Sequence, residues 1–305
     1  MNWQRSLKGK LKINVPLCRH TSIGVGGPVQ FWAEPKDAAD LRNLVQIIRK
    51  KRLPLRVIGA GTNILVDDRG LKGMVVKLSS PHFKRITINK EFICAGAGLS
   101  LTKLARYAQE KGLSGFELLA GIPGTIGGAL VMNAGNIGDR VLEATVIDKQ
   151  SKIKVIKKED IKFGYRVSSL GSYIILGVHF KLIKNSKSQV RRKIKRYLDY
   201  RKKTQDLTWP SCGCFFKNPS FDKLRMDPEQ SRKGPNSKSA AYLIERCGLK
   251  GSFIGDAVVS SKHANFILNK GKASSKDIIK LIDYITIHVK RRFNLYLVPE
   301  VKIWK

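Results

Sequence analysis

The chain contains Gly121-Ile122-Pro123-Gly124-Thr125-Ile126-Gly127-Gly128-Ala129-Leu130-Val131-Met132-Asn133-Ala134-Gly135, a stretch with five glycines and no Lys, Arg, Asp or Glu. Because glycine has no Cβ, such a backbone adopts positive φ readily and approaches a ligand closely. Successive main-chain N–H groups in this kind of loop form a concave anion site, and a helix that follows adds its positive end. The stretch predicts a neutral phosphate-binding loop. A buried turn packed between two elements is the alternative.

A second glycine loop, Gly59-Ala60-Gly61-Thr62-Asn63, follows an apolar strand expected over 55–58. The dinucleotide fingerprint G-x-G-x-x-G is incomplete, since Ile64 stands where its third glycine belongs. No acidic residue stands at a convincing ribose-binding position about 20 residues further on, which argues against a Rossmann site. Two neutral loops about 60 residues apart suggest one large dinucleotide held at two points.

Five motifs, in this order, resemble the UDP-N-acetylenolpyruvoylglucosamine reductase (MurB) family. They are the two glycine loops, Tyr165-Arg166-x-Ser168, Gly213-Cys214-Phe215-Phe216-Lys217-Asn218-Pro219 and Pro299-Glu300-Val301. The resemblance runs from about His20 to Val301. It implies an α+β fold, with an FAD-binding domain of the PCMH or vanillyl-alcohol-oxidase type and a smaller α+β substrate-binding domain.

The resemblance also implies domain bounds. We expect residues 1–186 to form the FAD-binding region, with two α+β subdomains, and residues 187–305 to form the substrate-binding domain. The last strand, near 295–304, is expected to carry the C-terminal glutamate. The short span of 48 positions from Arg166 to Cys214 resembles the compact subclass, which lacks a tyrosine loop over the substrate.

The activity that the resemblance implies is reduction of an enolpyruvyl ether, UDP-N-acetylglucosamine enolpyruvate, to UDP-N-acetylmuramate for peptidoglycan. Hydride comes from NADPH through non-covalent FAD. The UDP-sugar and NADPH are therefore the expected partners. By the same resemblance the FAD-binding residues are Gly59, Ala60, Gly61, Thr62, Asn63, Ile64, Leu65, Gly121, Pro123, Gly124, Thr125, Gly127 and Gly128.

This reaction needs a hydride at one alkene carbon, a proton at the other and a cation near the developing charge. The resemblance assigns the cation to Arg166, whose planar fork suits a carboxylate or enolate. Glu300, in an apolar stretch, is expected to be buried with a raised pKa and to assist the enol intermediate. A paired structural carboxylate is the alternative. The expected substrate-binding residues are Tyr165, Lys217 and Asn218, and weaker candidates for flavin or substrate contact are Asn133 and Ser168.

Cys214 stands where the family motif usually has a serine that donates the proton. A thiol, with a reference pKa near 8.5, is a stronger acid than an alcohol, so the role is chemically feasible. A nearby Arg166 or Lys217 would favour the thiolate, whereas the bound substrate carboxylate would favour the neutral thiol. We predict that Cys214 is the proton donor. Simple packing of a small cysteine is the alternative.

The net charge of +35 is extreme for 305 residues. It indicates either an anionic partner or, as we favour, solvated basic faces of a lysine-rich chain. The densest region, 187–203, has apolar residues at helical spacing and predicts an amphipathic helix with a basic outer face. No nucleic-acid-binding motif is present, so we expect no specific nucleic-acid partner. The charge is expected to steer anionic substrates to the site.

The cysteines and the hydropathy of the chain indicate its cellular compartment and argue against a metal site and a membrane span. Five cysteines, an odd number, fit a reducing compartment better than a disulfide framework. Cys212-Gly213-Cys214 lacks two further ligands at metal spacing, so no metal is expected. No apolar run of 18 residues and no signal-peptide core is present, which predicts a cytoplasmic protein without membrane insertion. We also expect the protein to be a monomer.

Two alternatives stay open at this point. One is another PCMH-type FAD oxidoreductase that acts on a small alcohol or amine. Many of these tether FAD through a histidine in the first glycine loop, and none of the five histidines here lies there. The more distant alternative is a nucleic-acid-binding protein. Separately, the polar, aperiodic segment 220–238 predicts an inserted loop, either a disordered insertion or a lid.

Overall fold

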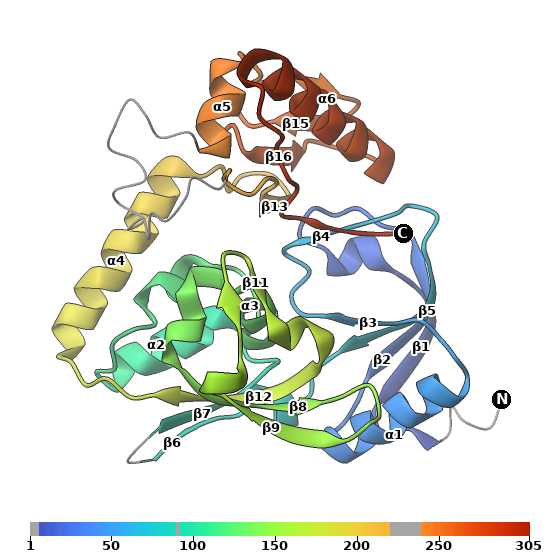
Figure 1. The fold of residues 1–305 in the computed structure, drawn as a ribbon, viewed down its shortest axis with the longest axis vertical. Coiled ribbons are helices and arrows are strands. Elements are labelled where there is room, and N and C mark those ends of the chain that lie inside the picture. Colours follow the sequence, from blue (N-terminus) through green and yellow to red (C-terminus); the bar gives the residue numbers. More distant parts are fainter. Residues whose placement is uncertain (1–5, 90–91, 220–238) are drawn as a thin grey trace. The chain divides into compact units, whose positions relative to one another are not determined.

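The structure, a computed structural model, describes residues 6–89, 92–219 and 239–305. By its contacts the chain forms two compact units (Figure 1). The first comprises Met1–Val15, Val29–Ala60 and Leu71–Arg201, and the second Pro16–Pro28, Gly61–Gly70 and Lys202–Lys305. The predicted inserted loop at 220–238 lies outside the described residues. The functional division between residues 186 and 187 stays a prediction.

The first unit contains a four-stranded sheet with the order β1 (Lys10–Pro16), β2 (Pro28–Glu34), β5 (Leu71–Lys77) and β3 (Leu55–Ile58). Strands β2 and β3 both run parallel to β5. Helix α1 (Ala38–Lys50) begins where the Asp37 side chain accepts a hydrogen bond from the Asp40 N–H. Its buried apolar positions lie at helical spacing and form one face of the helix.

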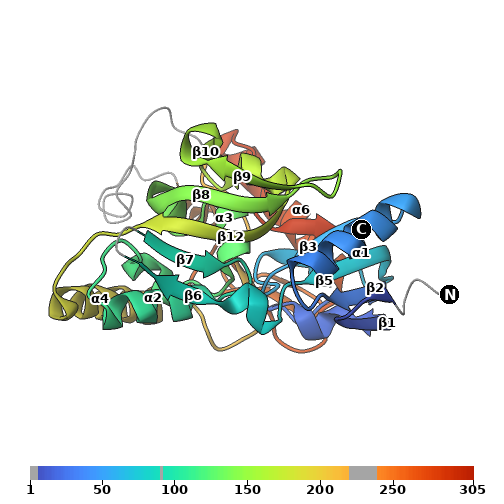
Figure 2. The same ribbon diagram turned by 90° about the horizontal axis from the view of Figure 1, so that it is seen from below.

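A five-stranded antiparallel sheet forms the rest of this unit's core (Figure 2). Its order is β6 (Ile86–Ile88), β7 (Phe92–Gly96), β12 (Ile174–Lys181), β8 (Val141–Ile147) and β9 (Ile153–Lys157). The remaining helices are α2 (Leu101–Glu110), α3 (Ile126–Met132) and α4 (Lys187–Thr204). One apolar cluster joins residues of both sheets with residues of α1, α2 and α3. The predicted basic helix is confirmed as α4, which buries Val190 and Ile194.

The second unit has an antiparallel sheet with the order β13 (Ser211–Cys214), β16 (Phe266–Asn269), β15 (Ala257–Val259) and β14 (Phe253–Ile254). Helices α5 (Ala240–Arg246) and α6 (Ser275–Phe293) share an apolar cluster with this sheet. Strand β17 (Lys302–Trp304) pairs in parallel with β4 (Ile64–Val66), which follows the first glycine loop. Among the described residues, no helix has the length and apolar character to cross a membrane.

Short elements complete the two units. They are the hairpin strands β10 (Phe163–Gly164) and β11 (Val167–Ser168) and the 3₁₀ helices η2 (Leu17–His20), η3 (Pro81–Lys84), η4 (Glu117–Gly121), η5 (Ala134–Arg140), η6 (Lys158–Asp160) and η7 (Ser169–Ser172).

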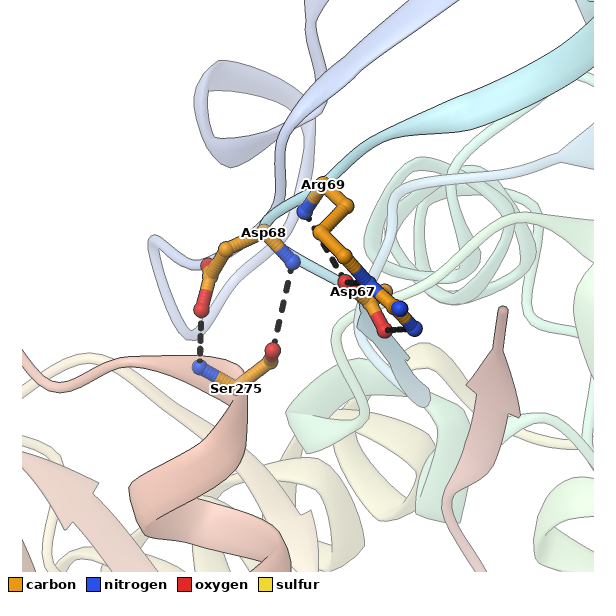
Figure 3. A network of polar contacts seen from close by, with 4 residues as sticks. All are labelled: Asp67, Asp68, Arg69 and Ser275. Atoms are coloured by element: carbon orange, nitrogen blue, oxygen red, sulfur yellow. Dashed lines mark hydrogen bonds and ion pairs between the residues drawn. The ribbon is translucent and has the colours of Figure 1, made fainter.

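The start of α6 is tied to the loop that follows β4. Ser274 and Asp277 form a capping box at the helix N-terminus. Figure 3 shows that the Asp68 carboxylate accepts a 2.6 Å hydrogen bond from the Ser275 N–H, while the Asp68 N–H donates to Ser275 Oγ at 3.2 Å. A carboxylate is favourable at a helix N-terminus, where the helix dipole is positive. These contacts fasten the end of the first glycine-loop segment to the C-terminal helix within the second unit.

Candidate functional site

The two glycine loops meet inside the first unit. A Cβ at Gly59 would lie 2.5 Å from Thr125 Oγ1, so only glycine permits this approach. Thr125 is also the N-cap of α3, and its hydroxyl accepts a hydrogen bond from the Gly128 N–H at 3.3 Å. Gly127 packs on the neighbouring backbone, donating to the Ala97 carbonyl at 2.8 Å. Two segments that lie far apart in sequence thus touch at Gly59 and Thr125.

The second half of the first loop belongs to the second unit. Gly61 has φ +70°, and a Cβ there would overlap the carbonyl oxygen of His20. The side-chain amide of Asn63 donates to the Glu300 carbonyl at 3.3 Å, and the Asn63 carbonyl accepts from the Lys302 N–H at 3.0 Å. The first glycine loop is therefore hydrogen-bonded directly to the C-terminal segment that carries Glu300.

The same C-terminal segment pairs with the motif that carries Cys214. Phe216 and Pro299 form an antiparallel bridge. The Glu300 N–H donates to the Phe215 carbonyl at 2.8 Å. Because Glu300 pairs with the neighbour of Cys214, the two predicted catalytic residues lie one position apart along paired segments. Glu300 is 9% exposed, and Cys214 is half-buried.

Asn265, just before β16, holds this motif in place. Its side-chain oxygen accepts a hydrogen bond from the Phe216 N–H at 2.9 Å, and its side-chain nitrogen donates to the Phe216 carbonyl at 2.8 Å. The Asn265 carbonyl also accepts from the Phe215 N–H at 2.9 Å. The side-chain amide thus pairs with the backbone of Phe216 just beyond the end of β13, as a neighbouring strand would. The sequence analysis did not single out Asn265, because a lone asparagine gives no signal of which backbone it contacts.

Cys212 and Cys214 have different surroundings although one residue separates them. Cys212 is 5% exposed, and its thiol lies 3.2 Å from the Ile64 carbonyl oxygen. Burial raises the pKa of the Cys212 thiol to about 12. Gly213 has φ +78°, a conformation that favours glycine. Within the part of the chain that the structure describes, no group of three His, Cys, Asp or Glu residues is arranged to hold a metal ion.

Arg166 and Tyr165 lie in the first unit, in the tight hairpin between β10 and β11. Arg166 is half-buried and has φ +57°, a rare conformation for a residue with a side chain. Such strain is concentrated at functional sites. The weaker candidates support this region through the backbone. Asn133 donates to the Gly164 carbonyl at 3.1 Å, and Ser168 donates to the Leu130 carbonyl at 2.7 Å.

Lys217 and Asn218 directly follow the buried pair Phe215 and Phe216. The Lys217 N–H donates to the Val298 carbonyl at 2.9 Å, which leaves its half-buried side chain at the edge of the paired segments. The Asn218 side-chain oxygen accepts from the Ala240 N–H at 3.0 Å at the start of α5. The structure therefore brings the 214–218 motif together with Glu300 and Asn63 in the second unit.

The glycine loops fit FAD. Neither loop carries a charged side chain. Where the two loops touch, Thr125 leaves no room for a side chain at position 59. Close backbone approach and main-chain donors are what a dinucleotide diphosphate requires. The expected FAD-binding residues of both loops stay a prediction at the level of single residues.

Two family models match the chain. An FAD binding domain matches residues 29–157, and the C-terminal domain of UDP-N-acetylenolpyruvoylglucosamine reductase matches residues 204–304. These matches, with the mixed sheets and helices, confirm the predicted α+β fold with an FAD-binding domain.

Curated relatives named UDP-N-acetylenolpyruvoylglucosamine reductase match nearly the whole chain. The protein from Caldanaerobacter subterraneus subsp. tengcongensis is 39% identical over 97% of this chain and 94% of its own length. The one from Desulforamulus reducens is 39% identical over 98% of this chain and 95% of its own length. The crystal structure of the MurB reductase from Thermus caldophilus superposes with a TM-score of 0.78 at 32% identity, covering 98% of this chain and 100% of that one. These matches favour neither a different flavin oxidase nor a nucleic-acid-binding protein. The chain belongs to the UDP-N-acetylenolpyruvoylglucosamine reductase family, and it is an FAD-containing oxidoreductase.

Proposed function

We propose that the protein reduces UDP-N-acetylglucosamine enolpyruvate to UDP-N-acetylmuramate, a step of peptidoglycan biosynthesis, with NADPH as the hydride donor. FAD, held without a covalent bond, supplies the chemistry that passes the hydride from NADPH to the alkene. The observation that carries this proposal is the pairing of Phe216 with Pro299, because it sets Cys214 and Glu300 on adjacent segments. A thiol and a carboxyl group are each able to deliver a proton to an alkene carbon.

The remaining site residues bind and orient the substrate. Arg166 holds the enolpyruvyl carboxylate and stabilises the negative charge that develops beside it. Tyr165, Lys217 and Asn218 contact the substrate, with Lys217 directed at its anionic groups. Cys214 gives up its proton to the alkene carbon that does not receive the hydride, and Glu300 assists.

We also propose a cytoplasmic monomer. The five cysteines all lie in the described residues and none of them forms a disulfide, in keeping with a reducing compartment.

Anaerobic reduction and reoxidation of the purified yellow protein tests the function. NADPH should bleach the flavin, and the enolpyruvyl UDP-sugar should then restore the yellow colour with formation of UDP-N-acetylmuramate. Rapid reduction followed by no substrate-dependent reoxidation would contradict the proposal. Acid precipitation should release all the flavin, and colour retained in the pellet would indicate a covalently flavinylated oxidase instead.

A further inference from the structure

The last turns of α4 lie against the second glycine loop inside the first unit. A Cβ at Gly121 would lie 3.2 Å from Arg201 Cδ, 3.6 Å from Leu198 Cδ2 and 3.8 Å from Arg201 Nη1. The guanidinium group therefore reaches the loop together with its aliphatic stem. A Cβ at position 121 would press on the Arg201 side chain, which would have to shift by a few tenths of an ångström.

One face of α4 sets the position of this contact. Val190 and Ile194 are buried, and Leu198 and Arg201 continue the same face at spacings of three to four residues. Near the middle of the helix, Lys193 Nζ lies 3.9 Å from Glu117 Oε1, where η4 begins. Helix η4 ends at Gly121, so Lys193 of α4 lies near one end of η4 and Arg201 contacts its other end.

Arg201 differs from the other basic residues of α4. It is half-buried, whereas the following are exposed: Lys187, Arg191, Arg192, Lys193, Lys195, Arg196, Lys202 and Lys203. Long basic side chains usually keep their charged heads in water. The stretch 121–135 contains no charged residue of its own. Helix α4 thus brings a cation to a loop that has no charged side chain of its own.

We propose that Arg201 binds the diphosphate of a nucleotide ligand at the Gly121 end of this loop, with the FAD diphosphate as its principal ligand. The inference rests on the proposed function only in its assignment of the loop to FAD. The planar guanidinium donates two parallel hydrogen bonds to phosphate oxygens, and these charge-assisted bonds are stronger than those from neutral main-chain donors. Glycine at position 121 keeps the space that this side chain occupies.

The test measures FAD affinity of the apoprotein by quenching of flavin fluorescence. Hydrogen bonds to charged groups correspond to about 10- to 100-fold in affinity, so Arg201→Gln should weaken FAD binding by that factor. Arg201→Lys, which keeps the charge but loses the fork, should fall between Gln and wild type. Lys203→Gln removes an exposed charge from the same helix and should stay within about twofold of wild type. Thermal unfolding of each apoprotein separates weak binding from poor folding.

Gly121→Ala provides a second variant that leaves the arginine in the chain. Its methyl group presses on the Arg201 stem and shifts it, so FAD affinity should fall in the same direction as in Arg201→Gln but by less. Arg201→Gln could instead leave FAD affinity unchanged and raise the KM for NADPH or for the UDP-sugar about 10-fold or more. In that case Arg201 binds the diphosphate of that substrate, and the inference stands. The inference would be overturned if the Arg201→Gln and Lys203→Gln variants had the same FAD affinity and the same KM values for NADPH and for the UDP-sugar. A wild-type protein that binds FAD but is not reoxidised by the enolpyruvyl UDP-sugar would refute the proposed function, while the FAD affinities would still decide the role of Arg201.

Discussion

A single glycine separates two thiols with different physical states. Cys212 is buried against the Ile64 carbonyl, whereas Cys214 is half-buried beside the segment that carries Glu300. Desolvation disfavours a thiolate, so Cys212 stays protonated well into the alkaline range. The two cysteines of this motif therefore differ in burial, and we propose the proton-donor role for Cys214 alone.

Cys212 should make the apoprotein sensitive to high pH. Its pKa is raised from an ordinary value of 9.0 to about 12 in the folded protein. The unfolded chain therefore loses the thiol proton first, and stability that is present below pH 9 is lost as the pH rises toward 12. Between pH 8.5 and 10.5 this group should cost about 2 kcal/mol of unfolding free energy. Urea unfolding at both pH values should show that loss in wild type and not in Cys212→Ala, after the losses common to both proteins are subtracted. Parallel pH profiles would contradict the prediction.

If Cys214 is the proton donor, as we propose, replacing it by serine and by alanine should have different effects on the reaction. Cys214→Ser keeps a donor and should retain a measurable rate of flavin reoxidation by substrate in a single turnover. Cys214→Ala should lose about 10²-fold or more, as expected for a missing general acid. The rate of flavin reduction by NADPH serves as the control and should change little in both variants. Near-wild-type reoxidation in Cys214→Ala would show that the proton comes from another group, such as Glu300 or water.

Among the elements of the second unit, the segment after β13 depends on a side chain for its hydrogen bonds. A regular strand pair would satisfy Phe216 through backbone groups, but here the Asn265 side chain makes both hydrogen bonds. Since Phe216 is buried, water cannot replace the amide.

Asn265→Ala should therefore destabilise the apoprotein by about 2–4 kcal/mol, because two buried main-chain groups lose their partner. Urea unfolding measures this loss, and single-turnover reoxidation should slow as Cys214 and Glu300 lose their fixed spacing. Asn43→Ala is a matched control, because Asn43 makes an exposed hydrogen bond to the Ser6 carbonyl. A loss in Asn265→Ala no larger than in Asn43→Ala would disprove the positioning role.

The contacts between Asp68 and the N-terminus of α6 should contribute to the stability of the protein. Asp68→Ala removes the carboxylate that accepts from the Ser275 N–H, and should lower the unfolding free energy by about 1–2 kcal/mol. Asp67→Ala, which removes the neighbouring exposed ion pair with Arg69, should have a smaller effect. Equal effects of the two substitutions would show that the Asp68–Ser275 contacts contribute nothing specific.

Over the whole molecule, the net charge of +35 should raise the rate at which anionic substrates associate with the protein. Salt screens long-range attraction, so kcat/KM for NADPH and for the UDP-sugar should fall roughly 10-fold between low ionic strength and about 0.3 M salt, while kcat changes little. A neutral viscogen such as sucrose controls for slower diffusion. Values of kcat/KM independent of salt would show that the positive charge plays no part in substrate capture.

Local signals in the sequence predicted most elements correctly. The Asp37 cap with apolar residues at helical spacing defined α1, and the spacing of Val190 and Ile194 defined α4. Such signals depend on residues within one or two turns of each other, so they are readable without the rest of the fold. The ordered motifs likewise sufficed to predict the family, the FAD-binding domain and the reaction.

The sequence by itself therefore indicated helix α4, the positions of the two glycine stretches and the chemistry that the motif residues offer, but not that the second stretch forms helix α3 over Ile126–Met132. Only the tertiary structure decided which of them meet: Gly59 with Thr125, Asn63 with Glu300, and Arg201 with Gly121. It also decided that residues 16–28 and 61–70 join the C-terminal unit. The physical reason is that contacts between distant segments depend on strand register and core packing across a whole unit. The residues at each contact carry no local record of their partners.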